Sequence, residues 1–496
     1  MADIAHILRL PPELLVQTSA YLTTIELGAF RSTCKHVEAT LFDSFAREFF
    51  TRRYFMIEEV SLDAFVGIAN HKRLAPCLTD VIIVLEKFCT NQNFEAMYVH
   101  RTYTGEYEHD ILVLTGGARD MLVDAFSKLP NLRLIGFHDA EGPPRSREPD
   151  QSWKSYGWSW GLAGNENVSQ PTYDRQAGRF MEDTDPGIVL PLVFYALGVA
   201  AARPRHVEVF TRQVDVPDRS FSVLSSWLQP KALPVLSGLK TLLLSTQRDY
   251  DEPSYPSRFP PDDDRSTSCG VLKYFLRHTT ALEHLRLNFY WERHQARQDD
   301  FLSWLSMPHD PSNVMSSPGL QRLSRLDLGM FNVDPRLLLK IIGKSQQLTL
   351  LSIWKATLLR ENQDGEINAW ETFLRELPQV IHQPLAFEHL TILWPIERWK
   401  DAPPKEGRAR RNTWMAFAKE VAIDAQGRKQ FKGESHRAEF SKGEDGDIKT
   451  WLQDLSSRLW LPPKMREGYE SPRPEWAVRQ DDEMLRMFTT QLPGED

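Results

Sequence analysis

The feature that most constrains the fold of this chain is a repeated pair of elements, an amphipathic helical segment followed within a few residues by a short apolar strand. The pair is clearest in residues 118–137, 269–290, 334–354 and 369–394. One such pair cannot bury its own apolar face, so neighbouring pairs must stack, with their strands side by side in a parallel sheet. The pattern therefore predicts an α/β protein.

The strand portions share a leucine-rich spacing. The positions that align are Leu129, Leu132, Ile135 and Phe137; Leu236, Leu239, Leu242 and Leu244; Leu282, Leu285 and Leu287; Leu320, Leu323, Leu326 and Leu328; Leu348, Leu351 and Ile353; and Phe387, Leu390 and Leu393. This spacing resembles that of leucine-rich repeats, and the resemblance implies an α/β solenoid. Ordinary α/β units in a doubly wound sheet would give the same alternation and remain the alternative.

The array is irregular. Leu282 and Leu323 are 41 residues apart, whereas Leu323 and Leu348 are 25 apart, and regular arrays repeat every 20 to 29 or so. The Asn or Cys that follows the strand in the family is also missing, because Phe331 and Tyr290 stand in its place. The turns therefore need other supports, and the curvature is not predicted.

Residues 8–49 predict a separate unit of three short helices. Pro11, Pro12 and Glu13 suit a first helical turn, and Thr23 and Thr24 are plausible caps for the second helix. Three helices of this size enclose little core, so the surplus apolar surface needs a partner.

The same residues resemble an F-box, a trihelical module that docks on the Skp adaptor of cullin-based ubiquitin ligases. The resemblance rests on Leu-Pro-Pro-Glu-Leu-Leu at 10–15, then Tyr21-Leu22, Leu27 and Cys34-Lys35, and covers roughly the first tenth of the chain. Thr18 and Val37 depart from the family pattern, which usually has an aliphatic residue and often tryptophan there. The resemblance implies that the adaptor interface is formed or shaped by Leu10, Pro11, Pro12, Glu13, Leu14, Leu15, Leu22 and Leu27. The alternative is an amphipathic bundle that packs on its own chain.

These patterns divide the chain into an F-box-like domain at 1–50, an irregular leucine-rich-repeat-like domain at 51–395 and a charged region of uncertain fold at 396–496. Two insertions interrupt the array, at about 140–187 and 248–268. The first is rich in Gly, Pro, Ser and Asp, yet it contains Trp153, Trp158 and Trp160. These three tryptophans are the candidates for target binding, because exposed tryptophans are enriched at binding hot spots. They could equally be packed beneath the array.

Composition and charge narrow the classes of function. The formal net charge is −8, which argues against wholesale binding of nucleic acid or of an anionic membrane. Four scattered cysteines predict neither a zinc site nor a disulfide framework, and with no signal-peptide pattern at the N-terminus we expect an intracellular protein, in the cytoplasm, the nucleus or both. The longest apolar run, 188–202, is too short for a membrane span and predicts a buried helix.

Catalytic and cofactor motifs are missing from the sequence. Gly343-Lys344-Ser345 resembles the end of a phosphate loop, but it ends a predicted helix, so its amides point the wrong way for phosphate. Asp262 to Asp264 and the basic stretch 405–411 are read as solvated segments, and the histidines as surface or satisfied residues. We therefore expect no catalytic residue, no cofactor and no metal.

Together these expectations describe a non-catalytic receptor that binds the Skp adaptor, and through it a cullin, and holds an unknown target protein on its repeat region. The alternative is an interaction scaffold that takes no part in ubiquitination. An enzyme with an unrecognised site near Trp153 is a third hypothesis.

Overall fold

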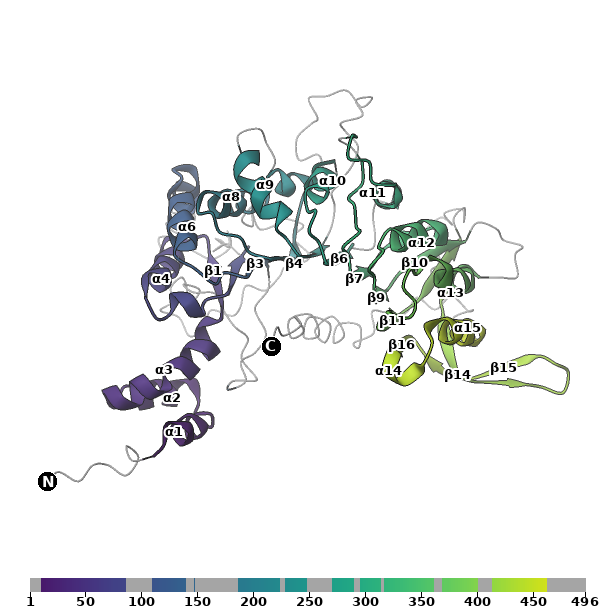
Figure 1. Cartoon of the computed structure of the whole chain (residues 1–496), viewed down its shortest axis with the longest axis horizontal. Coiled ribbons are helices and arrows are strands. Elements are labelled where there is room, and N and C mark those ends of the chain that lie inside the picture. The colour runs from purple at the N-terminus through teal and green to yellow at the C-terminus, as the bar shows by residue number, and fades with distance from the viewer. Residues whose placement is uncertain are drawn as a thin grey trace, which may run out of the picture. The chain divides into compact units, whose positions relative to one another are not determined.

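The computed structural model describes residues 10–85, 109–139, 147, 186–223, 228–247, 270–289, 295–313, 316–360, 368–399 and 413–461. The chain divides into two compact units, Met1–Pro204 with Arg473–Asp496, and Arg205–Pro472. The predicted α/β class is confirmed, since helices alternate with the strands of a large parallel sheet (Figure 1).

The first unit begins with the three predicted helices, α1 (Pro12–Ser19), α2 (Thr24–Arg31) and α3 (Lys35–Phe50). Alternating strands and helices follow: β1 (Arg52–Met56), α4 (Glu59–Asn70), the 3-10 helix η2 (Ala75–Cys77), β2 (Asp80–Val84), α6 (Gly117–Ser127), β3 (Leu134–His138) and α8 (Pro186–Val199). The strands pair in parallel in the order β1-β2-β3.

Aromatic side chains join the strands of this unit to its helices. The rings of Phe55 on β1 and Phe65 on α4 have centroids 4.5 Å apart, and Phe65 in turn meets Phe126 of α6 edge-on at 5.5 Å. All three are almost fully buried. Because alternate residues of a strand point to opposite faces, Phe55 can pack on the helices while its neighbours Tyr54 and Met56 join a second cluster with Ile82, Val84 and Leu134.

Helix α8 confirms that the apolar run at 188–202 forms a buried helix. Val189, Val193 and Leu197 are fully buried, and Pro191 lies inside the helix. No helix in the described parts of the chain is both long and apolar enough to cross a membrane.

The second unit continues the alternation. Its elements up to residue 399 are β4 (His206–Asp215), η3 (Asp218–Phe221), α9 (Gln229–Ser237), β5 (Thr241–Gln247), α10 (Gly270–Arg277), β6 (His284–Asn288), α11 (Gln295–Ser306), β7 (Arg325–Gly329), β8 (Asn332–Val333), α12 (Pro335–Gly343), β9 (Leu350–Trp354), β10 (Thr357–Arg360), α13 (Ala369–Val380), β11 (His389–Leu393) and β12 (Ile396–Trp399).

The main strands of the second unit run parallel in the order β4-β5-β6-β7-β9-β11, and α9 to α13 lie along one face of them (Figure 1). The leucine-rich spacing located β5, β6, β7, β9 and β11, but part of it lies outside the strands: Leu236 is in α9, and Leu239, Leu282, Leu320, Leu323 and Leu348 precede the strands. Within the strands, the pattern positions that are buried are Leu242, Leu244, Leu285, Leu287, Leu326, Leu328, Leu351, Ile353 and Leu390. In β11, Leu393 is half-buried, and Ile392, which the pattern did not include, is buried instead.

Three strands of the second unit end in the same left-handed turn. Met330, Lys355 and Trp394, which directly follow β7, β9 and β11, have φ values of 54°, 46° and 55°. The amide of Met330 donates to the carbonyl of Trp354 (2.9 Å), and the amide of Lys355 donates to that of Leu393 (2.8 Å). After each turn a second strand forms, and β8, β10 and β12 pair in parallel in a sheet of their own. These turns and their hydrogen bonds support the ends of the three strands.

The region after residue 395 contributes structure to the second unit. Its elements are β13 (Thr413–Trp414), β14 (Ala416–Ile423), β15 (Lys429–Ser435), β16 (Arg437–Ser441), α14 (Lys442–Asp445), α15 (Ile448–Arg458) and β17 (Leu459–Trp460). Strand β16 pairs antiparallel with β11 and so covers that edge of the parallel strands. Trp451 of α15 meets Phe440 of β16 edge-on at 5.6 Å, which shows why a charge-dense region carries tryptophans.

Candidate functional site

The three N-terminal helices enclose a small apolar core of their own. Its buried residues are Leu15, Leu27, Val37, Leu41 and Phe49, with Val16, Leu22, Phe30, Cys34, Phe45 and Phe50 packed against them. Residue spacing explains the composition, because Val37, Leu41, Phe45 and Phe49 recur once per turn of α3 and point to one side. The core is therefore filled from within the bundle.

Local hydrogen bonds fix how the chain passes from α1 to α2. The Thr23 side chain accepts from the backbone amide of Glu26 (3.3 Å), and the Glu26 carboxylate accepts from the amide of Thr23 (2.9 Å), which completes a capping box. The backbone and side-chain hydrogen bonds from Thr23 lower the pKa of Glu26, so this carboxylate stays ionised next to the helix N-terminus.

Four large apolar side chains of this unit remain exposed. The exposed fractions are 36% for Leu10, 44% for Leu14, 85% for Tyr21 and 84% for Ile25. They come from the start of α1, the turn after α1 and the first turn of α2. Single exposed apolar residues are common, but four within 16 residues of a bundle whose core is already filled make this part of the chain unusually apolar on its surface. We call these four residues the exposed apolar set.

The residues expected at an adaptor interface divide between surface and core. Leu10, Pro11, Pro12, Glu13 and Leu14 are exposed, and Leu22 is half-buried. Leu15 and Leu27 are buried in the bundle core, so they can shape the surface but cannot contact a partner.

Tyr21 and Ile25 are more exposed than the expected Leu10 and Leu14, and sequence reasoning did not single them out as site residues. Each of the two is a large apolar residue close to the sequence signals that mark the end of one helix or the start of the next, and this combination could have identified them. Of the two departures from the F-box pattern, Val37 lies in the core and Thr18 is exposed.

One residue of the first insertion holds the bundle from outside. The guanidinium of Arg147 donates to both oxygens of the Glu48 carboxylate (2.5 and 2.8 Å), and also to the backbone carbonyls of Ser19 (2.5 Å) and Leu22 (2.7 Å). Its side chain is only 9% exposed. A forked guanidinium suits this arrangement, since it can meet a carboxylate with two parallel bonds and still donate to the carbonyls of Ser19, which also accepts from the Leu22 amide, and of Leu22 in the turn after α1. We call this contact the Arg147 clasp.

A second candidate surface lies in the second unit, on the face of the parallel strands opposite α9 to α13. Here the residues that alternate with the buried leucines form rows across the sheet. One row reads Glu208, Leu243, Arg286, Asp327, Ser352 and Thr391, in strand order. We call this surface the opposite face. Parallel strands that are covered on both faces usually read as continuous apolar runs, so a polar row here needs an explanation.

Asp327 is the centre of a charged network on the opposite face. Its carboxylate accepts from Arg286 at 2.7 Å, from Nε2 of His284 at 2.8 Å and from Nε of Arg325 at 3.2 Å. Burial opposes ionisation of Asp327, but Arg286, His284 and Arg325 outweigh it and hold the pKa of the carboxyl well below its usual range. Burial lowers the pKa of His284, which favours a neutral ring that donates through Nε2.

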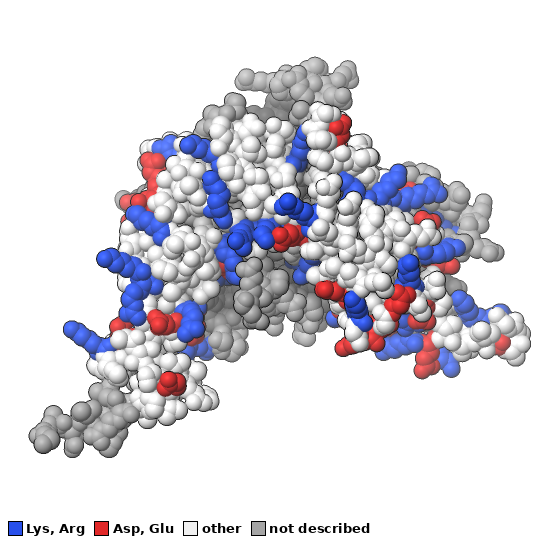
Figure 2. All heavy atoms as spheres, in the orientation of Figure 1, with Lys and Arg blue, Asp and Glu red and all other residues white. Residues whose placement is uncertain are grey.

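Figure 2 shows how charged side chains are distributed on one face of the described residues. On the face drawn in Figure 2, basic and acidic atoms are interspersed. Such a surface has no large single-sign field of the kind that steers a polyanion or a polycation.

Several residues raised by the sequence lie outside the described residues. They are Trp153, Trp158 and Trp160, together with Asp262 to Asp264, Cys89, Cys269 and the basic stretch 405–411. The target-binding role of the three tryptophans stays a prediction.

Other motifs raised by the sequence can be placed in the structure. Gly343 ends α12, as the sequence predicted for Gly343-Lys344-Ser345, and its carbonyl accepts from Nε2 of His382 at 2.6 Å. His284 is satisfied by Asp327. Within the described residues, no group of three or more His, Cys, Asp or Glu side chains could hold a metal ion.

Comparison with protein-family models finds no match for this chain, and comparison with curated proteins finds no significantly similar sequence.

Proposed function

We propose that this protein is the non-catalytic substrate-recognition subunit of a Skp, cullin, F-box ubiquitin ligase, and that α1 to α3 form its F-box. The observation that carries the proposal is the exposed apolar set on a bundle whose core is already filled. Such a surface is unfavourable in water and becomes favourable when a partner covers it. The Leu-Pro-Pro-Glu-Leu-Leu opening at 10–15 identifies the expected partner as a Skp adaptor.

The remainder of the chain would hold the target. We infer that the strand, left-handed turn and second strand repeated at β7–β8, β9–β10 and β11–β12 belong to a leucine-rich-repeat-like solenoid. A solenoid presents an extended surface to which a target can bind. Glu208, Arg286 and Asp327 of the opposite face are buried, so they organise the sheet and are not contacts for a target. Binding would act by proximity, because it raises the effective concentration of a target lysine near the ubiquitin-loaded enzyme.

The test is a titration of the full-length protein with the Skp adaptor of its own cell. We expect Leu14→Lys and Ile25→Lys each to weaken binding at least about thirtyfold, as loss of an interface hot spot does. Both side chains are exposed, so the variants should fold. Leu22 is unsuitable for this test because it packs on the bundle core.

Leu114→Lys is the matched control, because Leu114 is an exposed leucine (85%) of the same unit outside the bundle. It should bind the adaptor like the unmodified protein. If the unmodified protein fails to bind, or if all three variants bind equally well, the receptor proposal is wrong. The bundle would then serve an interaction scaffold that does not engage ubiquitination.

A further inference from the structure

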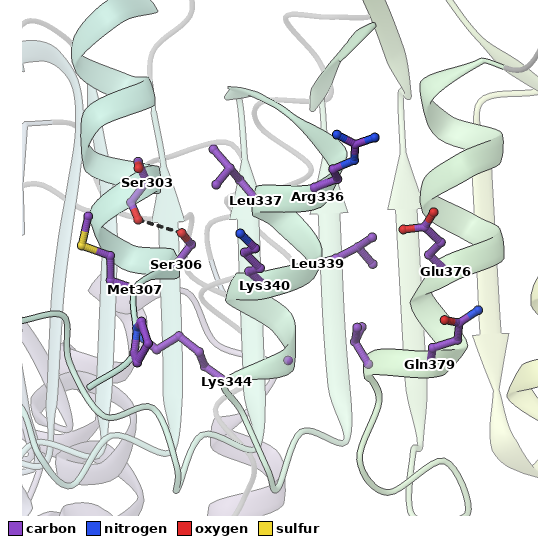
Figure 3. A pocket seen from close by; sticks show the side chains of 13 residues that line it. Ser303, Ser306, Met307, Arg336, Leu337, Leu339, Lys340, Lys344, Glu376 and Gln379 are labelled. Atoms are coloured by element: carbon purple, nitrogen blue, oxygen red, sulfur yellow. Dashed lines mark hydrogen bonds between the residues drawn. The ribbon is translucent and has the colours of Figure 1, made fainter. Parts of the chain in front are cut away.

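A shallow groove of about 790 Å³ runs along the helix-covered side of the second unit, where α11, α12 and α13 lie next to one another (Figure 3). It belongs neither to the exposed apolar set nor to the opposite face. From α11 and the residues after it come Ser303, Ser306, Met307 and Pro308, and from α13 come Glu376, Gln379 and Val380. Helix α12 forms the middle of the groove.

Three cationic side chains follow one another along α12. Arg336, Lys340 and Lys344 are spaced four residues apart and all line the groove, whereas Glu376 is the one carboxylate among its lining residues. In Figure 3, Lys340 and Lys344 point toward α11, and Arg336 lies at the other side of α12. The groove is therefore positively charged in a chain whose formal net charge is −8.

Lys344 is held in place without an acidic partner. Its ammonium group donates to the carbonyl of Leu305 (2.8 Å), near the end of α11, and to the hydroxyl of Ser317. Among the described residues no carboxylate forms an ion pair with Lys344 or Lys340. Burial lowers the pKa of Lys344 to about 8, as expected for a cation that gives up water without gaining a counter-charge. An anion in the groove would supply that charge.

The spacing of the cations suggests the shape of the anionic partner. Residues four apart on an α-helix are separated by about 6 Å along its axis, so the row from Arg336 to Lys344 covers about 12 Å. Alternate residues of an extended chain are separated by about 6.5 Å and point to the same side. An extended peptide that crosses α12 obliquely, from Arg336 on the α13 side to Lys340 and Lys344 on the α11 side, could therefore place every second side chain against successive cations. The exposed thioether of Met307 offers apolar contact for the residues between them.

We propose that this groove binds an extended acidic segment of a partner protein, with carboxylate or phosphate groups at alternate positions opposite Arg336, Lys340 and Lys344. This binding needs no adaptor, so it can succeed or fail independently of the F-box proposal.

The experiment uses the full-length protein and two fluorescent peptides of identical composition, measured by anisotropy at low salt. In the first peptide three glutamates alternate with alanines, and in the second the three glutamates are contiguous. We expect the alternating peptide to bind more tightly, and its affinity to fall as salt is raised, because exposed charge pairs are screened. Phosphoserine in place of glutamate should strengthen binding further.

Substitutions on α12 test whether the peptide binds in this groove. Arg336→Glu and Lys340→Glu should each weaken binding of the alternating peptide about five- to tenfold, which corresponds to the loss of one favourable charge contact and the gain of a repulsive one. Lys231→Glu is the matched control, since Lys231 is an exposed lysine on α9 in the same unit. Lys344 is left unchanged because it also supports the end of α11.

Absence of binding by the alternating peptide would overturn the proposal. So would equal binding of the two peptides, or equal weakening by Lys231→Glu, because either result would show an unspecific response to charge.

Discussion

Asp327 shows how a single acidic residue can organise a polar row within a sheet. It lies on β7 directly beside Arg286 of β6, and the two side chains are 5% and 2% exposed. Removing one partner of such a buried pair leaves the other charge without compensation, at a cost of about 3–5 kcal/mol. Two more donors, His284 and Arg325, are held by the same carboxylate. Four charged or polar side chains therefore meet between β6 and β7, where apolar contacts would otherwise join the two strands.

We expect Asp327→Asn to destabilise the second unit by about 3 kcal/mol at neutral pH. The pKa of Asp327 in the folded protein lies below its ordinary value of 3.8, so its stabilisation is present above that value and is lost as the pH falls through the folded pKa. The difference in unfolding free energy between the two proteins should therefore shrink as urea unfolding is measured from pH 7 to pH 3.

Asp43→Asn is the control for this measurement, because the Asp43 side chain is 81% exposed and pairs with the half-exposed Arg73 at 3.6 Å. It should change stability little at any pH. A constant difference between Asp327→Asn and the unmodified protein across the pH range would contradict the assignment of the network to an ionised Asp327.

At the scale of elements, the left-handed turns after β7, β9 and β11 set the direction in which each second strand leaves. An L-residue in this conformation costs about 1–2 kcal/mol, and it is uncommon for residues other than glycine, asparagine and aspartate. Met, Lys and Trp occupy the three positions, so residue type gave no signal for the turn. The hydrogen bonds between neighbouring turns, such as that from Met330 to Trp354, offset the strain only once the strands are paired.

The turn residue should therefore be sensitive to side-chain shape. We expect Met330→Val to lower stability about 1–2 kcal/mol more than Met330→Asn, because a β-branched residue is disfavoured at positive φ whereas asparagine tolerates it. Thermal unfolding of the two variants checks the order. Met307 is the control position, because its φ is not positive. There, valine should not lower stability more than asparagine does. If valine and asparagine are equivalent at Met330, the turn does not constrain the strand ends.

Regular elements could be predicted from the sequence, and the contacts between distant segments could not. Leucine spacing located β3, β5, β6, β7, β9 and β11, and Asp334 followed by Pro335 marked the start of α12, where the Asp334 side chain accepts from the Arg336 amide at 2.8 Å. These signals are local, because strand alternation and helix capping involve neighbours in sequence. The contribution of β16 to the sheet edge is non-local, and the sequence of residues 396–496 gave no indication of it.

The candidate site, like the fold, could be predicted from the sequence only where it depends on residues close together in the chain. The helices of the bundle and its exposed Leu14 were predictable, but Leu15, the next residue, proved to be buried. Helical periodicity places residues on faces, and it does not say which face the bundle uses for itself. The cationic groove needed three helices to be placed side by side before Arg336, Lys340 and Lys344 could be recognised as one surface.

At the scale of the whole molecule, the Arg147 clasp connects the bundle to a residue 99 positions beyond Glu48. We expect Arg147→Met to loosen α1 and α3, at a cost of about 3 kcal/mol, since it removes the guanidinium that pairs with the Glu48 carboxylate and donates to the carbonyls of Ser19 and Leu22. Hydrogen exchange should show faster exchange of amides in these two helices. Arg119→Met, which removes an exposed pair with Asp120, is the control and should leave them unchanged. Unchanged exchange in both variants would show that the bundle is stable without the clasp.

The clasp also has a consequence for synthesis. A ribosome adds about 5–20 residues per second, so roughly 5–20 s pass between the incorporation of Glu48 and that of Arg147. Throughout this interval Leu14, Tyr21 and Ile25 have already been made, while the guanidinium that joins α1 to α3 has not. The nascent bundle then exposes apolar side chains before the Arg147 clasp can form, which makes this early period the time at which a chaperone would have the greatest effect on the yield of folded protein.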